Sequence, residues 1–326
     1  MGLGILAEGK WLTEREQEDS QGRFVRPSTT FRNKITADGS SGFKAEPDRY
    51  HLYICWACPW AHRTAIMRQL KGLENVISLS VVAPEIEENG WEFSDEPGSI
   101  PDTVNHTRYL WEVYLKADPN YSGRVTVPVL WDKETATIVN NESRDIIRIF
   151  DTEFEAIALK NVSFYPKNLR GVIDETIDAI YQPINNGVYR AGFATTQSAY
   201  EEAVTELFEA LDHWEGVLER QRYLGGDRIT EADWCMFTTL LRFDAVYYSH
   251  FKCNLRRIVD YPNLWNYLKE LYQVLGVKET CNLDHIKRHY YNSHPNVNPT
   301  RIVPKGPLIN FDAPHNRYRM GATVTA

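Results

Sequence analysis

The sequence of 326 residues has few cysteines, an excess of acidic over basic residues and no long hydrophobic run. Five cysteines are too few, and an odd number, for a disulfide framework, so the cytoplasm is the expected compartment. The 36 Lys and Arg residues against 44 Asp and Glu give a net charge of −8, which argues against a nucleic-acid-binding surface. Without an apolar run of membrane-spanning length, and with a start that turns acidic too early for a signal peptide, we expect no membrane association.

The length of the chain and its 43% of hydrophobic residues favour two domains. Residues 1–45 are polar and lack a sustained period, and we interpret them as an extended arm lying on the domains, with disorder as the alternative. Residues 46–160 then form one domain, and residues 161–326 form a second, with a C-terminal extension.

Hydrophobic patterning predicts an α/β order in the first domain and helices in the second. Strands are expected over 50–54, 76–82, 125–131 and 137–139, helices over 59–70 and 143–150, and a polar insert over 90–120. The thioredoxin-like arrangement is one fold with this order. Apolar residues at helical spacing predict helices over 172–184, 198–220, 231–248 and 264–275. The predicted fold is an α/β thioredoxin-like N-terminal domain followed by an all-α C-terminal domain.

Two cysteines, Cys55 and Cys58, lie in a C-x-x-C spacing at the end of the predicted strand 50–54. Pro59 follows, and proline is favoured at the first position of a helix because its missing N–H would have no intrahelical partner there. Cys58 is therefore the expected N-cap of the helix over 59–70, with its sulfur facing the amides and the positive dipole end of the first turn. A thiol placed in this way has a lowered pKa and is a nucleophile at neutral pH.

The Cys55–Cys58 pair is nevertheless in the wrong frame for a dithiol whose first cysteine caps the helix. In a dithiol enzyme of this fold the second cysteine follows inside the first helical turn, and Ala61 occupies that position. Cys55 lies upstream at the strand end, where a cysteine is usually a small buried hydrophobe. Arg63 would add to the positive field of the first turn, although a charged residue there is more often solvated. We interpret the site as a monothiol site with Cys58 as the nucleophile, and a redox role of Cys55 is the alternative.

The sequence Trp-Ala-Cys-Pro-Trp-Ala-His-Arg around Cys58 closely resembles the active-site motif of glutathionyl-hydroquinone reductases, the Xi class of glutathione transferases. The resemblance covers nearly the whole chain. Further segments that carry it are GRFVRP (22–27), GWEF (90–93), RVTVP (124–128), NES (141–143), YRAGFA (189–194), RFD (242–244), HFKCN (250–254) and IKRHYY (286–291).

The resemblance implies that glutathione is a co-substrate bound by the first domain. The residues expected to contact it are Trp91, Arg124, Val125, Thr126, Val127, Glu142 and Ser143. Val127 precedes Pro128, where thioredoxin-like proteins have a cis proline and offer backbone groups to a peptide. The simpler alternatives are an ordinary edge-strand proline and a tryptophan that only packs.

Two segments show the form of a helix start. Ser143 is the expected N-cap of the helix over 143–150, and this helix end is an anion site suited to the γ-glutamyl carboxylate of glutathione. Glu142 would pair with the ammonium group, and a serine that only caps is the compatible alternative. Thr230-Glu-Ala-Asp233 has the form of a capping box and is interpreted as structural.

Three tyrosines, Tyr189, Tyr247 and Tyr290, match positions that the family places around the cysteine and the aromatic substrate. The implied reaction begins when the Cys58 thiolate attacks the sulfur of a glutathionyl-hydroquinone and forms a mixed disulfide with glutathione. Tyr189 is the expected proton donor to the ring, and Tyr247 and Tyr290 would stabilise the thiolate or the quinol oxygens. A second glutathione then releases oxidised glutathione.

The implied reaction requires neither a metal nor a nucleotide, and the family implies a homodimer. His285 and His289 are four residues apart, a spacing that suits a metal on a helix, but no third ligand is apparent. One alternative function is an omega-like cysteine transferase that reduces dehydroascorbate or mixed disulfides. Another is a non-catalytic scaffold, although such proteins commonly lose the cysteine or the serine that are both present here.

Overall fold

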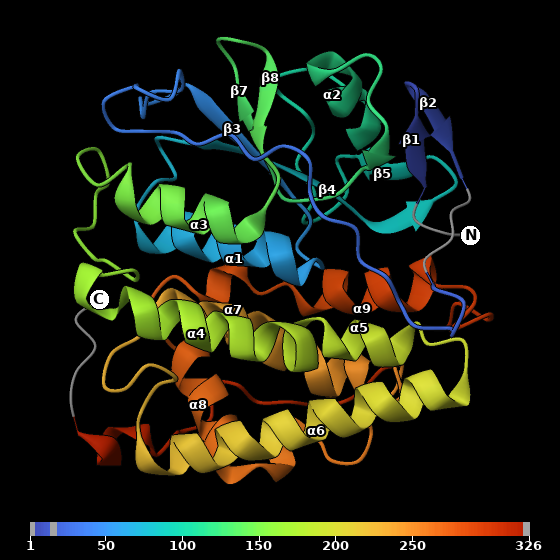
Figure 1. Ribbon diagram of the computed structural model, residues 1–326, viewed down its shortest axis with the longest axis vertical. Coiled ribbons are helices and arrows are strands. Elements are labelled where there is room, and N and C mark those ends of the chain that lie inside the picture. Colours follow the sequence, from blue (N-terminus) through green and yellow to red (C-terminus); the bar gives the residue numbers. More distant parts are fainter. Residues whose placement is uncertain (1–3, 14–17, 322–326) are drawn as a thin grey trace. The chain divides into compact units, whose positions relative to one another are not determined.

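The structure, a computed structural model, describes residues 4–13 and 18–321 as two compact units (Figure 1). The first, which we call the sheet unit, comprises residues 4–13, 27–162 and 279–303. The second, the helical unit, comprises residues 18–26, 163–278 and 304–321. Both units are therefore assembled from stretches that are far apart in the chain.

A five-stranded sheet in the order β5-β4-β3-β7-β8 forms the centre of the sheet unit. Its strands are β3 (Tyr50–Ile54), β4 (Ser78–Glu87), β5 (Gly90–Phe93), β7 (Val129–Asp132) and β8 (Thr137–Asn140). The pair β3 and β4 is parallel, and the other neighbouring pairs are antiparallel. Helices α1 (Pro59–Leu70) and α3 (Ser143–Thr152) pack against each other below this sheet in Figure 1. The predicted thioredoxin-like order is confirmed.

The sequence pattern located β3 and α1 at their observed bounds but misplaced several others. β3 is central and buried along its whole length, which is why its residues are almost all large and apolar or aromatic. The predicted strand over 125–131 begins only at Val129. The segment 90–120, predicted as a polar insert, instead contains β5 and the helix α2 (Leu110–Ala117). The segment looks polar because α2 is short and buries side chains on only one of its faces.

The start of the chain contains a second, small sheet that the arm interpretation did not predict. Its strands, in the order β2-β1-β6, are β1 (Ile5–Ala7), β2 (Lys10–Leu12) and β6 (Gly123–Arg124). Glu8 and Gly9 connect β1 and β2, and both have positive φ angles, 47° and 75°. Two such residues in a row give the tight turn that suits a two-residue hairpin.

The helical unit is built from five α-helices and two π-helical turns within the described residues. The α-helices are α4 (Arg170–Ile180), α5 (Gly187–Gly192), α6 (Gln197–Arg220), α7 (Glu231–Arg242) and α8 (Pro262–Tyr272). The π-helical turns η2 (Tyr181–Asn185) and η3 (Phe243–Tyr247) end α4 and α7, where the sequence predicted uninterrupted helices. The short 3-10 turns of this unit are η1 (Lys167–Leu169), η4 (Ile258–Asp260) and η6 (Arg317–Met320), and a further one, η5 (Lys278–Thr280), lies where the chain passes from the helical unit to the sheet unit.

The capping box predicted at Thr230 is confirmed at the start of α7. Asp233 accepts hydrogen bonds from the Thr230 amide at 2.8 Å and from the Thr230 hydroxyl at 3.0 Å. Helix α7 is buried at every residue, so this start is fixed inside the core of the helical unit. In the described part of the chain, none of the helices combines the length and the apolar composition that a membrane span requires.

One late helix joins the sheet unit. α9 (Leu283–Ser293) packs against β4 and carries the two histidines and the tyrosine that the sequence singled out near residue 289. Asn282 begins it by accepting a hydrogen bond from the His285 amide at 3.0 Å.

Candidate functional site

Cys58 is the N-cap of α1 with extended backbone angles (φ −75°, ψ 119°), and Pro59 is the first helical residue, as predicted, but the Cys58 side chain makes no capping hydrogen bond to the first turn. The Cys58 amide donates to the Cys55 carbonyl at 3.1 Å, and its carbonyl accepts the His62 amide at 2.9 Å. Cys58 is partly exposed, whereas Cys55 and Ala61 are fully buried. A reagent can therefore reach the thiol of Cys58 but not that of Cys55.

The Cys58 thiol lies beside the loop that leads into β7. Its Sγ atom is 3.6 Å from the carbonyl oxygen of Val127, and the bond between Val127 and Pro128 is cis, as predicted. Val125 and Val127 are buried, and Arg124 is half-buried in β6, where it pairs with Ile5 of β1. The sulfur thus meets the backbone of the segment expected to hold glutathione.

Tyr114 of α2 fixes this loop, and the sequence reasoning missed it. Its hydroxyl donates to the Thr126 carbonyl at 2.8 Å and accepts the Thr126 amide at 3.2 Å. Burial raises the pKa of the Tyr114 phenol, so the hydroxyl keeps the proton that it donates. In the sequence, Leu110, Val113 and Tyr114 stand at helical spacing, and this spacing is the signal that identifies the helix.

At the start of α3 the expected cap was assigned one residue too late. Glu142, not Ser143, is the N-cap: its backbone is extended (φ −104°, ψ 117°) and its carboxylate accepts the Arg144 amide at 3.3 Å. Ser143 is already helical and buried, and its hydroxyl is 3.5 Å from the Glu142 carboxylate. Thr29 also donates to Glu142, at 3.3 Å. The two residues remain adjacent at a helix N-terminus, which can stabilise an anion.

Arg63 of α1 brings a positive charge to the same place. The residue is 3% exposed, so the alternative that it is solvated is wrong. One guanidinium nitrogen lies 3.5 Å from the Ser143 hydroxyl, and the guanidinium carbon lies 4.5 Å from the centre of the Trp60 ring. A buried cation between α1 and the start of α3 adds to the field that attracts a carboxylate.

Trp91 of β5 lies against α9. Its ring stacks on His289 with 5.1 Å between centroids and 16° between planes, and His289 Nδ1 is 2.8 Å from the Pro84 carbonyl. Tyr290, which is 1% exposed, meets the His289 ring edge-on at 5.0 Å. His285 Nε2 is 2.9 Å from the Pro97 carbonyl. Within residues 4–13 and 18–321, no group of three or more His, Cys, Asp or Glu side chains could hold a metal ion.

The helical unit brings the other two predicted tyrosines together. Tyr189 is half-buried on α5, Tyr247 is fully buried at the end of η3, and their ring centroids are 6.0 Å apart. Phe251 lies 5.6 Å from each of them and stacks on Tyr247 at 10°. These rings form one aromatic cluster with two phenol groups, which suits an aromatic ligand.

The remaining cysteines differ from Cys58 in their surroundings. Cys235 and Cys253 are fully buried, and burial raises the pKa of the Cys253 thiol. Cys281 is partly exposed, and its Sγ atom is 3.9 Å from His62 Nε2. Cys58 therefore differs from the other cysteines in combining exposure with the N-cap position of a helix.

Two family models match the chain. The model described as "Glutathione S-transferase, N-terminal domain" matches residues 57–153, and the one described as "Glutathione S-transferase, C-terminal domain" matches residues 197–270. The first match contains Cys58, Val127 and Ser143, and it lies within the sheet unit.

Curated relatives match over nearly their full length. Glutathionyl-hydroquinone reductase YqjG of Escherichia coli K12 is 52% identical over 323 residues, which are 97% of this chain and 98% of that protein. Glutathionyl-hydroquinone reductase PcpF of Sphingobium chlorophenolicum is 51% identical over 306 residues, 94% and 96% of the two chains. Glutathione S-transferase omega-like 2 of Schizosaccharomyces pombe is 47% identical over 309 residues, 92% and 98%.

Solved structures agree with these relatives. A Xi-class glutathione transferase from Natrialba magadii superposes with a TM-score of 0.94 at 53% identity and covers 98% of each chain. The glutathione-bound structure of YqjG from Escherichia coli K-12 has a TM-score of 0.86 at 55% identity, covering 88% of this chain and 96% of that one.

Proposed function

This chain belongs to the glutathionyl-hydroquinone reductases, the Xi class of glutathione transferases, and we propose that it reduces glutathionyl-hydroquinones to hydroquinones at the expense of glutathione. The observation that carries this proposal is the single accessible thiol of the C-x-x-C segment. Cys58 is partly exposed at the start of α1 and lies beside the Val127 carbonyl, while Cys55 is buried.

In the first step the Cys58 thiolate attacks the glutathione sulfur of the substrate. The bond between that sulfur and the ring carbon breaks, its electron pair stays on the ring carbon, and a disulfide forms between Cys58 and glutathione. The ring carbon then takes a proton, for which Tyr189 is the donor. Tyr247 and Tyr290 donate hydrogen bonds to the thiolate or to the quinol oxygens.

In the second step the thiolate of another glutathione attacks the mixed disulfide. Oxidised glutathione leaves, Cys58 returns to the thiolate, and the proton released by the second glutathione restores the Tyr189 phenol. Two glutathione sulfurs are thereby oxidised to a disulfide while the ring carbon is reduced. The resolving thiol comes from glutathione, which agrees with the buried alanine at position 61. All of these steps are sulfur and proton transfers, so the proposed reaction uses neither a metal nor a nucleotide.

Glutathione is proposed to lie along the loop before Pro128 and at the start of α3. Backbone groups of the loop would pair with its cysteinyl part, and Glu142 and Ser143 would hold its γ-glutamyl end. Arg63 supports this placement because its buried charge lies next to the Ser143 hydroxyl. The other residues proposed to contact glutathione are Trp91, Arg124, Val125, Thr126 and Val127.

The proposal is tested by following glutathione-dependent reduction of a synthetic glutathionyl-hydroquinone. We expect Cys58→Ala to abolish turnover, and Cys58→Ser to abolish it while still binding glutathione by calorimetry. Tyr189→Phe should slow the formation of hydroquinone. The same variant should still form the mixed disulfide between Cys58 and glutathione when it is given a small disulfide of glutathione in place of the glutathionyl-hydroquinone. Full activity of either Cys58 variant would refute the mechanism.

A second candidate is an omega-like transferase activity on dehydroascorbate or small mixed disulfides, which the name of the Schizosaccharomyces pombe relative suggests. It uses the same nucleophile without requiring the tyrosines. Assayed side by side, a protein of this kind would reduce dehydroascorbate faster than the glutathionyl-hydroquinone and would be insensitive to Tyr189→Phe.

We also propose a cytoplasmic homodimer, in which residues 46–160 serve as the glutathione-binding domain and residues 161–326 as the substrate domain. A reactive thiol and a low cysteine content support a reducing compartment. Light scattering coupled to size-exclusion chromatography tests the dimer, since it gives the mass directly.

A further inference from the structure

We propose that Arg26 is a positioning residue that stabilises the phenolate of Tyr189 and thereby sets how readily Tyr189 gives up its proton. This inference rests on the proposed function, in which Tyr189 protonates the substrate ring. Arg26 belongs to residues 18–26, a segment that we call the strap, and both the strap and Tyr189 lie in the helical unit.

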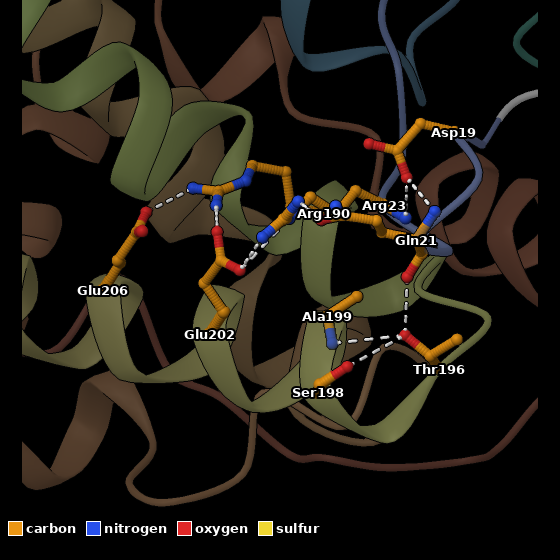
Figure 2. Close-up of polar contacts among 9 residues, drawn as sticks. All are labelled: Asp19, Gln21, Arg23, Arg190, Thr196, Ser198, Ala199, Glu202 and Glu206. Carbon is orange, nitrogen blue, oxygen red and sulfur yellow. Dashed lines mark hydrogen bonds and ion pairs between the residues drawn. The ribbon is translucent and has the colours of Figure 1, made fainter.

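The strap is anchored to the start of α6 by polar contacts (Figure 2). Asp19 folds it by accepting the amides of Gln21 at 2.8 Å and Arg23 at 3.0 Å. The Thr196 hydroxyl donates to the Gln21 carbonyl at 2.8 Å, and Arg23 pairs with the Glu202 carboxylate at 2.7 Å. These bonds hold a segment without regular structure against a helix that lies some 180 residues later.

The same carboxylate connects the strap to α5. Arg190, the residue after Tyr189, pairs with Glu202 at 3.4 Å and also with Glu206 (Figure 2). Arg23 and Arg190 thus share Glu202, so the position of the strap and the position of the Tyr189 backbone depend on one ionic network. Such a network limits movement of the strap more than a single exposed ion pair would.

The strap places Arg26 over the face of the Tyr189 ring. The guanidinium carbon is 4.8 Å from the Tyr189 centroid, and its Nε donates to the Asn186 side chain at 2.8 Å. Phe24, which is buried, lies 5.2 Å below the same guanidinium and 6.4 Å from the Tyr189 ring. The guanidinium is therefore oriented by a hydrogen bond and by two aromatic rings.

A cation over a phenol ring is attracted to its electron-rich face. When the phenol loses its proton, the ring carries a full negative charge, so the same cation stabilises the phenolate more than the phenol. Tyr247 of η3 also faces Tyr189, and it is uncharged in its ordinary form. The neighbouring Arg190 guanidinium is directed at two carboxylates, and Phe193 and Phe251 are apolar. Arg26 is thus a charged group whose contact with the ring favours proton release.

The direct test measures the ionisation of Tyr189 without any substrate. The protein is labelled with fluorotyrosine, the Tyr189 signal is assigned by its loss in Tyr189→Phe, and its chemical shift is followed against pH by fluorine NMR. Arg26→Met keeps a long unbranched side chain without the guanidinium charge, and we expect it to move the Tyr189 midpoint to higher pH. Arg26→Lys should restore part of the shift. An unchanged midpoint in Arg26→Met would overturn the inference.

Arg256→Met is the matched control, because Arg256 in the same unit also lies over a tyrosine ring, 4.7 Å from the Tyr261 centroid, and pairs with Asp212. It removes the same charge and the same type of contact, and we expect the Tyr189 midpoint to stay unchanged. An equal shift in this control would also overturn the inference, because a general loss of positive charge would then explain the effect.

Kinetics connects the ionisation to the reaction. Arg26→Met should lower kcat for the glutathionyl-hydroquinone by about threefold to tenfold, the range that a cation–π contact at a half-buried site supplies. The alkaline limb of the kcat profile should move up with the Tyr189 midpoint, and no further loss should occur in a Tyr189→Phe background. A midpoint that moves while Tyr189→Phe is fully active would support the contact between Arg26 and Tyr189 and refute the proposed role of Tyr189 as the acid.

Discussion

The Sγ atom of Cys58 lies 3.6 Å from the carbonyl oxygen of Val127, a residue 69 positions later in the chain. The first atom belongs to the N-cap of α1 and the second to the residue before a cis proline. A peptide thiol that pairs with this loop would be delivered next to the sulfur. The contact therefore places the proposed nucleophile beside the segment proposed to bind glutathione.

Cys58 should be the cysteine that an alkylating reagent modifies first. It is partly exposed and sits at a helix N-terminus, which favours the thiolate, whereas Cys55 is fully buried. With a limiting amount of iodoacetamide at neutral pH, peptide mass spectrometry should find the label on Cys58 and little on Cys55. Cys55→Ala should retain most of the turnover, since its thiol takes no part in the proposed exchange.

Cys281→Ser is the control for this experiment. Cys281 is also partly exposed, but it lies beside a histidine and precedes Asn282, the N-cap of α9, without being the cap residue itself. Its removal should leave the rate of labelling at Cys58 unchanged. Faster labelling of Cys55 than of Cys58 would contradict the monothiol assignment.

The position of Cys58 at a helix N-cap could be predicted from the sequence because it depends on adjacent residues. A strand, a cysteine and a proline at the first helical position determine the cap locally, and the bounds of β3 and α1 agree with the prediction. The capping box at Thr230 and Asp233 is a local pattern of the same kind. Signals within a few residues of one another were sufficient for these features.

Features that depend on contacts between distant segments were missed. Arg63 is buried because the start of α3 lies beside it, 80 residues later in the chain, and no pattern near Arg63 indicates this. Tyr114 was hidden in a stretch that looks polar, because its role is to bond the backbone of Thr126. The cap of α3 was misassigned because a serine is the more common cap, whereas here the preceding Glu142 takes the extended backbone.

Glu142→Gln should weaken glutathione binding with little effect on folding. The amide oxygen can still accept the Arg144 amide and cap α3, but the charge proposed to pair with the ammonium group is lost. A hydrogen bond to a charged group contributes about 1.5–3 kcal/mol, so we expect the Kd for glutathione to rise by roughly tenfold or more, measured by calorimetry.

The matched control is Glu153→Gln at the other end of the same helix, where Glu153 is the C-cap residue. It removes an equal charge from α3, and both variants should keep the melting temperature within a few degrees of the wild type. Equal weakening of glutathione binding by the two substitutions would show that the effect comes from net charge and not from contact with the ligand.

His51 should make the fold less stable in mild acid. It is fully buried in β3 between the hydroxyls of Ser78 and Ser80, and burial lowers its pKa from 6.5 to about 4, outweighing the attraction of Asp102. As the pH falls, His51 takes up a proton in the unfolded chain near pH 6.5 but in the folded chain only near pH 4. The stability that neutral His51 contributes to the fold is therefore fully present above pH 6.5 and is lost as the pH falls towards 4. The linkage gives about 2 kcal/mol lost from the free energy of unfolding between pH 7.5 and 5.

His51→Gln tests this assignment, because glutamine can bond both serines but cannot be protonated in this range. Urea unfolding at the two pH values should show a smaller acid loss for the variant than for the wild type, by about the same 2 kcal/mol. The NMR signals of the His51 ring should also not titrate above pH 5. Parallel stability curves for the two proteins would assign the acid sensitivity to other groups.

Gly192 and Gly216 should respond in opposite ways to alanine. A Cβ atom at Gly192, the last residue of α5, would lie 2.2 Å from the ring of Phe251, which is fully buried against Tyr189 and Tyr247. Overpacking of this kind costs about 1–3 kcal/mol. Gly216 lies within α6 with no atom within 4 Å of the added Cβ, and alanine there should stabilise the helix by about 1 kcal/mol. Thermal melts should show a lower melting temperature for Gly192→Ala and a higher one for Gly216→Ala. Only Gly192→Ala should also lower kcat for the glutathionyl-hydroquinone, because it displaces the Phe251 ring that contacts both tyrosines. A Gly192→Ala protein with wild-type kcat and a lowered melting temperature would mean that the Phe251 ring contributes to folding alone.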